Sequence, residues 1–181
     1  STVRYGNAPG NLSLLTTIAA STTEHQVTLT GLQPATRYYY SVGSPSATCA
    51  GNDLTYFFVT SPPLDSTVPT RIWVIGDSGS GDSFARTVRD AYAAHTGETH
   101  TNLWLMLGDN AYNDGTDEEF QAAVFDTYPE LLRKSVLWPT FGNHDALSAD
   151  SATQTGPYYD IFTLPKNAEV GGVPSLTEAY Y

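Results

Sequence analysis

The feature that most constrains the fold of this chain is a set of three short polar motifs, each directly after an apolar run. The motifs are Gly76-Asp77-Ser78-Gly79, Gly108-Asp109-Asn110-Ala111-Tyr112 and Gly142-Asn143-His144-Asp145. They are evenly spaced, by 32 residues (109 − 77) and then by 34 (143 − 109). A strand, a crossover helix and the next parallel strand take about 30 residues, so the motifs are expected at one edge of a single parallel sheet. Oxygen ligands that meet at the carboxyl edge of a sheet are typical of a site for a hard metal ion.

The stretches between the motifs predict two crossover helices. The first begins at about Asp82 or Ser83 and ends at Gly97. Its expected core face is Phe84, Val88, Ala91 and Tyr92. The second opens with a capping box at Thr116-Asp117-Glu118-Glu119, and the residues expected to point inward are Phe120, Val124 and Phe125. After Asp145 the chain becomes loop-like, and residues 179–181 are expected to begin another strand.

Residues 1–61 predict an all-β domain. Apolar and polar residues alternate from Leu29 to Val42, and this period of two indicates strands with one buried face. The other expected strands are Thr2–Tyr5, Leu12–Thr16, Gln26–Leu29 and Leu54–Val59. Short strands broken by Gly and Pro favour a β-sandwich. The run Leu32–Tyr40 resembles the corner of fibronectin-type-III-like sandwiches, where a Tyr hydroxyl ties a crossing loop to a strand.

A proline-rich linker is predicted at residues 62–69, since the run Ser61–Pro69 holds three prolines, which favour extended backbone. Residues 70–181 then follow the order β-α-β-α-β. The sequence therefore predicts a two-domain α+β protein whose second domain contains only a thin, three-stranded parallel layer. Because parallel sheets are normally covered on both faces, we expect that domain to be truncated.

Charge and hydropathy exclude two classes of partner. The formal net charge is −11, which argues against nonspecific nucleic-acid binding, because such binding relies on basic surface. No stretch approaches the roughly 20 apolar residues of a membrane span, so no membrane partner is expected. A composition poor in Lys and Cys but rich in Thr, Ser and Tyr favours a secreted, extracellular protein, with periplasmic and cell-surface placement left open.

The first two motifs offer three oxygen ligands. Asp77 and Asp109 supply carboxylates, and one carboxylate can bridge two cations that lie about 3.5–4 Å apart. Tyr112, three residues after Asp109, can reach the same centre, and its phenolate would suit a ferric ion. Taken alone, a Gly-Asp at a strand end is often a turn or a helix cap, and a tyrosine is often a packing residue.

The third motif adds an amide and an imidazole. Asn143 offers a neutral amide oxygen to a metal, and His144 can reach the phosphoryl oxygens or the leaving group of a substrate. Asp145 is expected to set the orientation and the tautomer of His144. Gly-Asn-His-Asp is rare as a plain turn. With all three motifs in this order and spacing, the metal site is the favoured interpretation.

In order and content, these motifs resemble those of the calcineurin-like metallophosphoesterase superfamily. Tyr112 and the preceding sandwich make the chain similar to the purple acid phosphatases in particular. The resemblance implies that Asp77 and Tyr112 bind Fe(III), that Asp109 bridges two metals, and that Asn143 binds a divalent ion (zinc, manganese or iron). It implies that His144 contacts the substrate or protonates the leaving group.

The chain departs from the family pattern in two ways. Many purple acid phosphatases have Glu at the position of Asp145. The family also completes its site with three histidines in motifs of the forms Val-x-x-His and Gly-His-x-His, which no residues after Gly142 match. The resemblance therefore implies half of a dinuclear site in the β-α-β-α-β half of a four-layer α/β domain, as in a proteolytic fragment, a nicked enzyme or a truncated chain.

We expect a hydrolase of phosphomonoesters of the acid phosphatase type, which acts through a metal-bound hydroxide. Its expected partners are a small-molecule phosphate ester and its own C-terminal segment. One alternative is a phosphodiesterase or nucleotide phosphatase of the same superfamily. Another is a catalytically silent fragment that acts as a binding or assembly piece.

Overall fold

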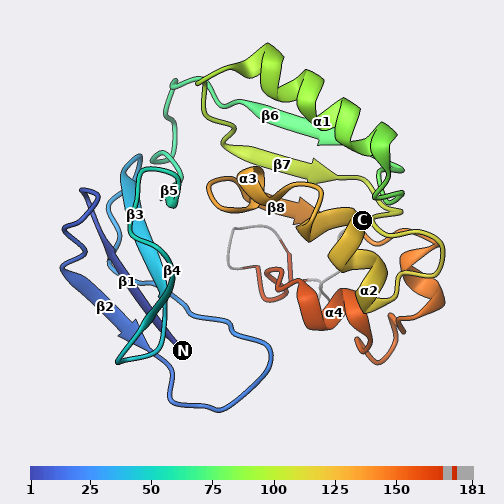
Figure 1. Cartoon of the computed structure of the whole chain (residues 1–181), viewed down its shortest axis with the longest axis horizontal. Helices are drawn as coiled ribbons and strands as arrows, with labels where there is room; N and C mark the ends of the chain where they lie inside the picture. The colour runs from blue at the N-terminus through green and yellow to red at the C-terminus, as the bar shows by residue number, and fades with distance from the viewer. Residues whose placement is uncertain (169–172, 175–181) are drawn as a thin grey trace. The chain divides into compact units, whose positions relative to one another are not determined.

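A computed structural model describes residues 1–168 and 173–174, and the strand expected at residues 179–181 lies outside these residues. The chain divides into two compact units. The first contains Ser1–Thr70 together with Arg133–Val136, and the second contains Arg71–Leu132 and Leu137–Tyr181. Each unit is built on its own sheet (Figure 1).

The first unit is an antiparallel sheet, as its alternating sequence predicts. Its central strand, β3, pairs with β1 along one edge and with both β4 and β5 along the other, while β2 extends the sheet beyond β1. The five strands are β1 (Thr2–Gly6), β2 (Leu14–Thr17), β3 (Arg37–Gly43), β4 (Thr48–Gly51) and β5 (Phe57–Val59).

Three predictions for this unit differ from the structure: the strand at Gln26–Leu29, the start of the strand in the alternating run, and the two-sheet sandwich. Gln26–Leu29 lie outside the strands of the described chain, and the alternating run from Leu29 enters a strand only at Arg37. Residues 19–26 are all exposed, so this polar stretch has no apolar face that would hold it against a sheet. The five strands consequently form one sheet within the described residues, whereas a sandwich requires two facing sheets.

The corner predicted around Leu32–Tyr40 is confirmed. The backbone N–H of Gln33 donates to the Tyr38 hydroxyl at 3.0 Å. The Tyr38 ring is buried, lies edge-on to Tyr5 and stacks on Phe58. One tyrosine thus contributes apolar area to the core of the unit and ties the preceding loop to β3.

The second unit is built on the predicted three-stranded sheet. Its strands are β6 (Ile72–Ile75), β7 (Leu103–Met106) and β8 (Val136–Pro139), in the order β6-β7-β8. β6 and β7 pair in parallel, and all three arrows point the same way in Figure 1. The carboxyl ends of the strands, where the three motifs begin, therefore share one edge.

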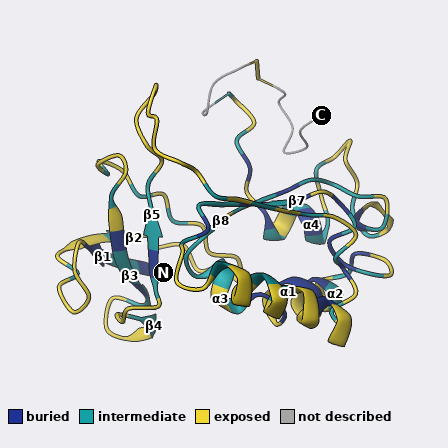
Figure 2. Ribbon diagram, turned by 90° about the horizontal axis from the view of Figure 1, so that it is seen from above, coloured by how far each residue is buried: buried dark blue, intermediate teal, exposed yellow. Residues whose placement is uncertain are grey.

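The first crossover helix, α1 (Ser83–Thr96), has the predicted ends and a different buried face. The Asp82 carboxylate accepts the N–H groups of Phe84 and Ala85, and Gly97 closes the helix with φ 54°. Phe84 and Val88 are exposed at 78% and 54%, and the helix instead buries Ala85. Exposed residues occur along much of α1 in Figure 2. The predicted core face was therefore wrong for Phe84, Val88 and Ala91; only Tyr92 turns inward, where its ring stacks on Trp73 at 4.2 Å.

The second crossover, α2 (Asp117–Phe120), continues into a π-helical turn, η1 (Gln121–Phe125), and the predicted capping box is present. Phe120 and Val124 are fully buried as predicted, but Phe125 is 37% exposed. A π turn holds more residues than an α turn, which rotates Phe125 off the core face. The remaining helices are α3 (Pro129–Leu132), the 3-10 turn η2 (Asp145–Leu147) and α4 (Pro157–Ile161).

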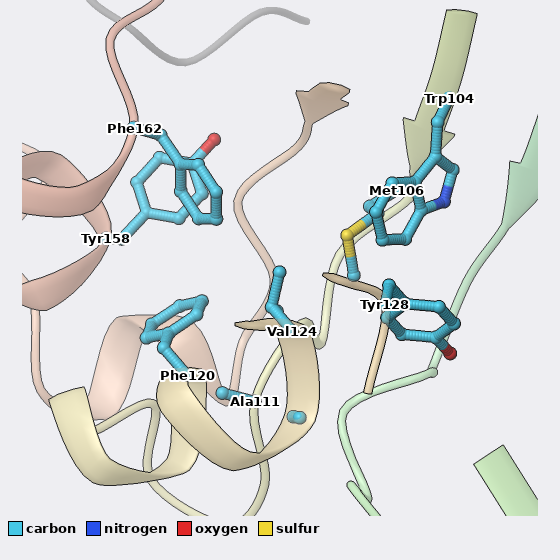
Figure 3. Close-up of a cluster of buried hydrophobic side chains, with 9 residues drawn as sticks. Trp104, Met106, Ala111, Phe120, Val124, Tyr128, Tyr158 and Phe162 are labelled. Carbon is cyan, nitrogen blue, oxygen red and sulfur yellow. The ribbon is translucent and has the colours of Figure 1, made fainter. Parts of the chain in front are cut away.

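The core of the second unit lies between the sheet and these helices (Figure 3). Its fully buried residues are Trp104, Met106, Ala111, Phe120, Val124 and Tyr158, with Tyr128 and Ala123 nearly so. On the opposite face of β6, Ile72 and Val74 are exposed at 48% and 51%. Among the described helices, none combines the length and the apolar character needed to cross a bilayer.

Candidate metal centre

The structure brings the first two motifs side by side at the carboxyl edge of the parallel sheet. Asp77 follows β6 and Asp109 follows β7, and the N–H of Asp77 donates to the carbonyl of Gly108 at 3.2 Å. Both aspartates adopt left-handed backbone conformations, with φ 51° and 52°. Residues other than glycine rarely adopt this conformation, and such positions cluster at functional sites.

Tyr112 links the two aspartates. Its hydroxyl lies 3.3 Å from Asp77 Oδ1 and 3.4 Å from Asp109 Oδ2. Burial, followed by the charges of Asp109 and Asp77, raises the pKa of Tyr112 to about 12. In this arrangement the tyrosine keeps its proton and donates it toward the carboxylates, because a phenolate would be repelled by both of them.

The oxygen atoms of three side chains therefore converge at one point. A cation bound there would replace the local negative charge with a positive one. A bound cation would neutralise the two carboxylates and favour the phenolate, and hard oxygen donors suit a ferric or divalent ion. Within the described residues no group of three or more His, Cys, Asp or Glu side chains is placed to hold a metal ion. The oxygen atoms that converge here belong to the carboxylates of Asp77 and Asp109 and to the Tyr112 hydroxyl. The residues present thus fit the oxygen-rich side of a metal site.

Glycines in the motifs allow the loops to approach this closely. A Cβ on Gly79 would lie 2.6 Å from the backbone nitrogen of Ala111, and a Cβ on Gly142 would overlap the backbone nitrogen and Oδ1 of Asp109. The third motif therefore lies directly against Asp109. Side chains at these positions would force the motifs apart.

The third motif approaches Asp109 through its backbone. The N–H of His144 donates to Asp109 Oδ1 at 3.1 Å, so the predicted bridging carboxylate is already oriented by this motif. Asn143 precedes His144 and is exposed. Among the described residues its side chain makes no hydrogen bond to Asp77, Asp109 or Tyr112, so its role as a ligand stays a prediction.

The His144 ring lies edge-on to Tyr112, with 4.6 Å between ring centroids. Its Nδ1 is 2.5 Å from the carbonyl oxygen of Asn113. Because a carbonyl can only accept, Nδ1 carries the proton in this contact, and Nε2 is the ring nitrogen available to a ligand.

The expectation that Asp145 orients His144 is corrected by the structure. Asp145 has 0% exposure, and its carboxylate accepts the Asn110 backbone N–H at 3.1 Å, Asn110 Nδ2 at 2.7 Å and the Gly142 N–H at 2.8 Å. Burial raises its pKa, and the N–H groups of Gly142 and Asn110 oppose this shift. Because Asp145 lies in the η2 turn and points inward, it joins the second motif to the third and contacts neither the His144 ring nor solvent.

The sequence interpretation missed Asn110. This residue is fully buried, and its side chain donates both to Asp145 and to the Thr140 carbonyl at 2.8 Å. The only signal in the sequence was an amide directly after Asp109, and its partners lie 30 and 35 residues away. Of the other histidines, His25 belongs to the first unit, while His95 lies in the last turn of α1 and His100 precedes β7, away from the carboxyl edge.

Comparison with known protein families gives two matches that together span most of the chain. Residues 1–60 match the model of the purple acid phosphatase N-terminal domain, and residues 70–179 match the model of the calcineurin-like phosphoesterases. Among curated proteins, the chain is 31% identical over 166 residues to purple acid phosphatase 15 of Arabidopsis thaliana, which covers 79% of this chain. It is 28% identical over 139 residues to a purple acid phosphatase of Glycine max, which covers 74% of this chain.

These relatives are much longer than the region they share with this chain. The matched region makes up 30% of the Arabidopsis protein and 28% of the Glycine max protein.

Proposed function

Because this chain belongs to the calcineurin-like phosphoesterase family and begins with the N-terminal domain of purple acid phosphatases, we propose that it contributes to the hydrolysis of phosphate monoesters. The observation that carries this proposal is the convergence of Asp77, Asp109 and Tyr112 at the carboxyl edge of the sheet. In open α/β sheets, ligands bind at the carboxyl edge of the strands, so polar side chains that meet there are candidates for an active site.

In this proposal the chain supplies the oxygen ligands of a dinuclear site. Asp77 and Tyr112 would hold Fe(III), Asp109 would bridge, and Asn143 would hold a divalent ion, either Zn, Mn or Fe. When bound, these cations would neutralise the charge of the phosphate ester and activate water. Only one of the four histidines, His144, lies at this edge, so we propose that imidazole ligands come from C-terminal polypeptide beyond these residues.

His144 is proposed to handle the proton of the leaving group. With Nδ1–H directed to the Asn113 carbonyl, Nε2 carries a proton only in the imidazolium form. An acid phosphatase is consistent with that requirement. The same imidazolium would contact the phosphoryl oxygens before it protonates the departing alkoxide.

The proposed setting is extracellular, and the proposed substrate is a small phosphate ester. With a formal charge of −11, the chain would repel nucleic acid, and the bound cations would offset this charge only at the site itself. A phosphodiesterase is the second candidate, since the family model that matches residues 70–179 is named for phosphoesterases in general.

The test is metal content and hydrolysis, measured on this chain and on a longer protein that includes the C-terminal polypeptide. We expect near-stoichiometric iron with a second metal, a visible absorption band from the Tyr112 phenolate, and faster cleavage of p-nitrophenyl phosphate than of its diester. Tyr112→Phe should lose the band and most of the iron. Tyr39→Phe, a substitution in the first unit, serves as the matched control.

Three outcomes would contradict parts of the proposal. Equal iron in Tyr112→Phe would remove the ferric assignment. Preferential cleavage of the diester would favour the phosphodiesterase. Negligible metal in both proteins would favour a catalytically silent fragment that acts in binding or assembly.

A further inference from the structure

One carboxylate, that of Glu119, holds the loop between Tyr112 and α2. Its Oε1 accepts the N–H of Asn113 at 2.5 Å, and its Oε2 accepts those of Asp114 and Thr116, each at 3.0 Å. Burial opposes its ionisation, but the N–H groups of Thr116, Asp114 and Asn113 outweigh this effect, and the pKa of Glu119 lies below its usual value. A capping box uses only the Thr116 bond, so the other two hold the loop itself.

This loop, residues 113–116, lies directly against the third motif. The Asn113 carbonyl accepts from His144 Nδ1 at 2.5 Å, and the Gly115 carbonyl accepts from Ser148 Oγ. Gly115 is buried with φ 67°, and a Cβ there would lie 2.7 Å from Asp145 Cα. The position of the Asn113 carbonyl is therefore set on one side by Glu119 and on the other by the third motif.

The Asn113 carbonyl decides the tautomer of the neutral His144 ring. As long as this acceptor stays at Nδ1, the proton resides on Nδ1 and the lone pair on Nε2. If the loop moved away, the carbonyl would no longer favour one tautomer of His144, and the single proton of the neutral ring would be shared between Nδ1 and Nε2. A group that holds the loop thus acts on the imidazole through one peptide unit.

We propose that Glu119 is a positioning residue for His144, which selects the Nδ1-protonated tautomer and presents Nε2 to the substrate through the carbonyl of Asn113. The identity of that substrate rests on the proposed function; the selection of the tautomer does not. The competing explanation is that Glu119 only caps α2. The two differ because a cap stabilises the helix without any effect on the imidazole.

The test compares Glu119→Gln and Glu119→Ala with the control Thr116→Ala by ¹⁵N NMR of the His144 ring. The metal-free chain is used at about pH 8, where histidine is mostly neutral. In Glu119→Gln, the side-chain amide keeps one oxygen that can accept within the capping box. Its second acceptor oxygen is replaced by an NH₂ group, which can only donate. Thr116→Ala removes the hydroxyl that accepts the Glu119 N–H at 3.3 Å and leaves the Glu119 carboxylate in place. His144→Gln assigns the signals.

We expect an Nδ1-protonated signature in the wild type and in Thr116→Ala, and a shift toward a mixture of tautomers in both Glu119 variants. An unchanged His144 signature in folded Glu119 variants, or an equal shift in Thr116→Ala, would overturn the proposal. If the Glu119 variants do not fold, hydrogen exchange of the wild type decides. Protected N–H groups at residues 113, 114 and 116 would support the clamp, and exchange at the rate of an open loop would refute it.

These measurements need neither metal nor activity. A shifted tautomer in a chain without metal or phosphatase activity would leave the positioning role intact and count against the proposed function alone. An active phosphatase whose His144 signature ignores Glu119 would refute the positioning role alone.

Discussion

The Tyr112 hydroxyl lies between two carboxylates, and the charge around it decides whether it holds its proton. Its raised pKa, about 12 against the ordinary 10.0, means that the folded chain keeps a proton which the unfolded chain releases across this window. The free energy of unfolding should therefore fall as the pH rises from 10 toward 12. The measurement is the ultraviolet titration difference between the wild type and Tyr112→Phe, which isolates this tyrosine among twelve. A Tyr112 that titrates at its ordinary value would contradict this expectation.

Ferric ion should reverse the sign of this shift. A cation that binds Asp77 and Asp109 removes the repulsion that holds the proton on Tyr112, so the phenolate should form at neutral or lower pH. Titration in the presence of Fe(III) checks this expectation.

Asp145 is a structural link between two motifs, and its removal should cost stability first. Asp145→Ala leaves the buried N–H of Asn110 without an acceptor, at a cost of about 1–3 kcal/mol, and also removes the acceptor of the part-buried Gly142 N–H. Asp145→Asn should cost less, since its amide oxygen still accepts. Urea denaturation measures both variants. Full stability of Asp145→Ala would show that these donors find other acceptors.

At the scale of the elements, the turns after the strands determine how closely the motifs approach. Gly142→Ala should displace Asp109, because the new Cβ would overlap its backbone nitrogen and Oδ1. We expect this variant to lose metal affinity and about 1–3 kcal/mol of stability, as overpacked sites do. Gly76→Ala is the matched control, since its Cβ would make only an ordinary contact with Leu107 Cβ at 3.4 Å. Equal effects of the two substitutions would rule out the close approach as the cause.

The buried face of α1 can be tested directly. Ala85 is 8% exposed, so Ala85→Leu should overpack the core and cost about 1–3 kcal/mol. Phe84 is 78% exposed, so Phe84→Ser should change the stability of this chain by less than about 0.5 kcal/mol. Thermal unfolding of the two variants distinguishes this arrangement from the sequence prediction, under which Phe84→Ser would be the damaging change.

At the scale of the whole molecule, residues 61–70, at the end of the first continuous stretch of the first unit, should be the most accessible of the described segments. Residues 61–70 are all exposed, and Leu64 reaches 95% exposure. Limited digestion with chymotrypsin should therefore cut first after Leu64, as in other exposed loops. Mass spectrometry identifies the cut, and Leu64→Gly should slow it. A first cut within a strand or helix of either unit would contradict this expectation.

The sequence by itself determined the features that depend on local order. The N-cap at Asp82, the stop at Gly97 and the capping box at Thr116 each involve neighbours within a few residues, and all three are present. The even spacing of the motifs also placed Asp77 and Asp109 at one edge of a parallel sheet, because each strand and crossover helix repeats the same length. The family follows from these motifs and their order.

The tertiary structure decided which side chains meet across long sequence separations. Asp145 joins Asn110, 35 residues away, and leaves the His144 ring to the carbonyl of Asn113, a backbone atom that no side-chain pattern reveals. The apolar residues of α1 follow a helical period on two sides, and only contact with the sheet selects the side of Ala85 and Tyr92. Local interactions are encoded by neighbouring residues, whereas these choices depend on how distant segments fill the same space.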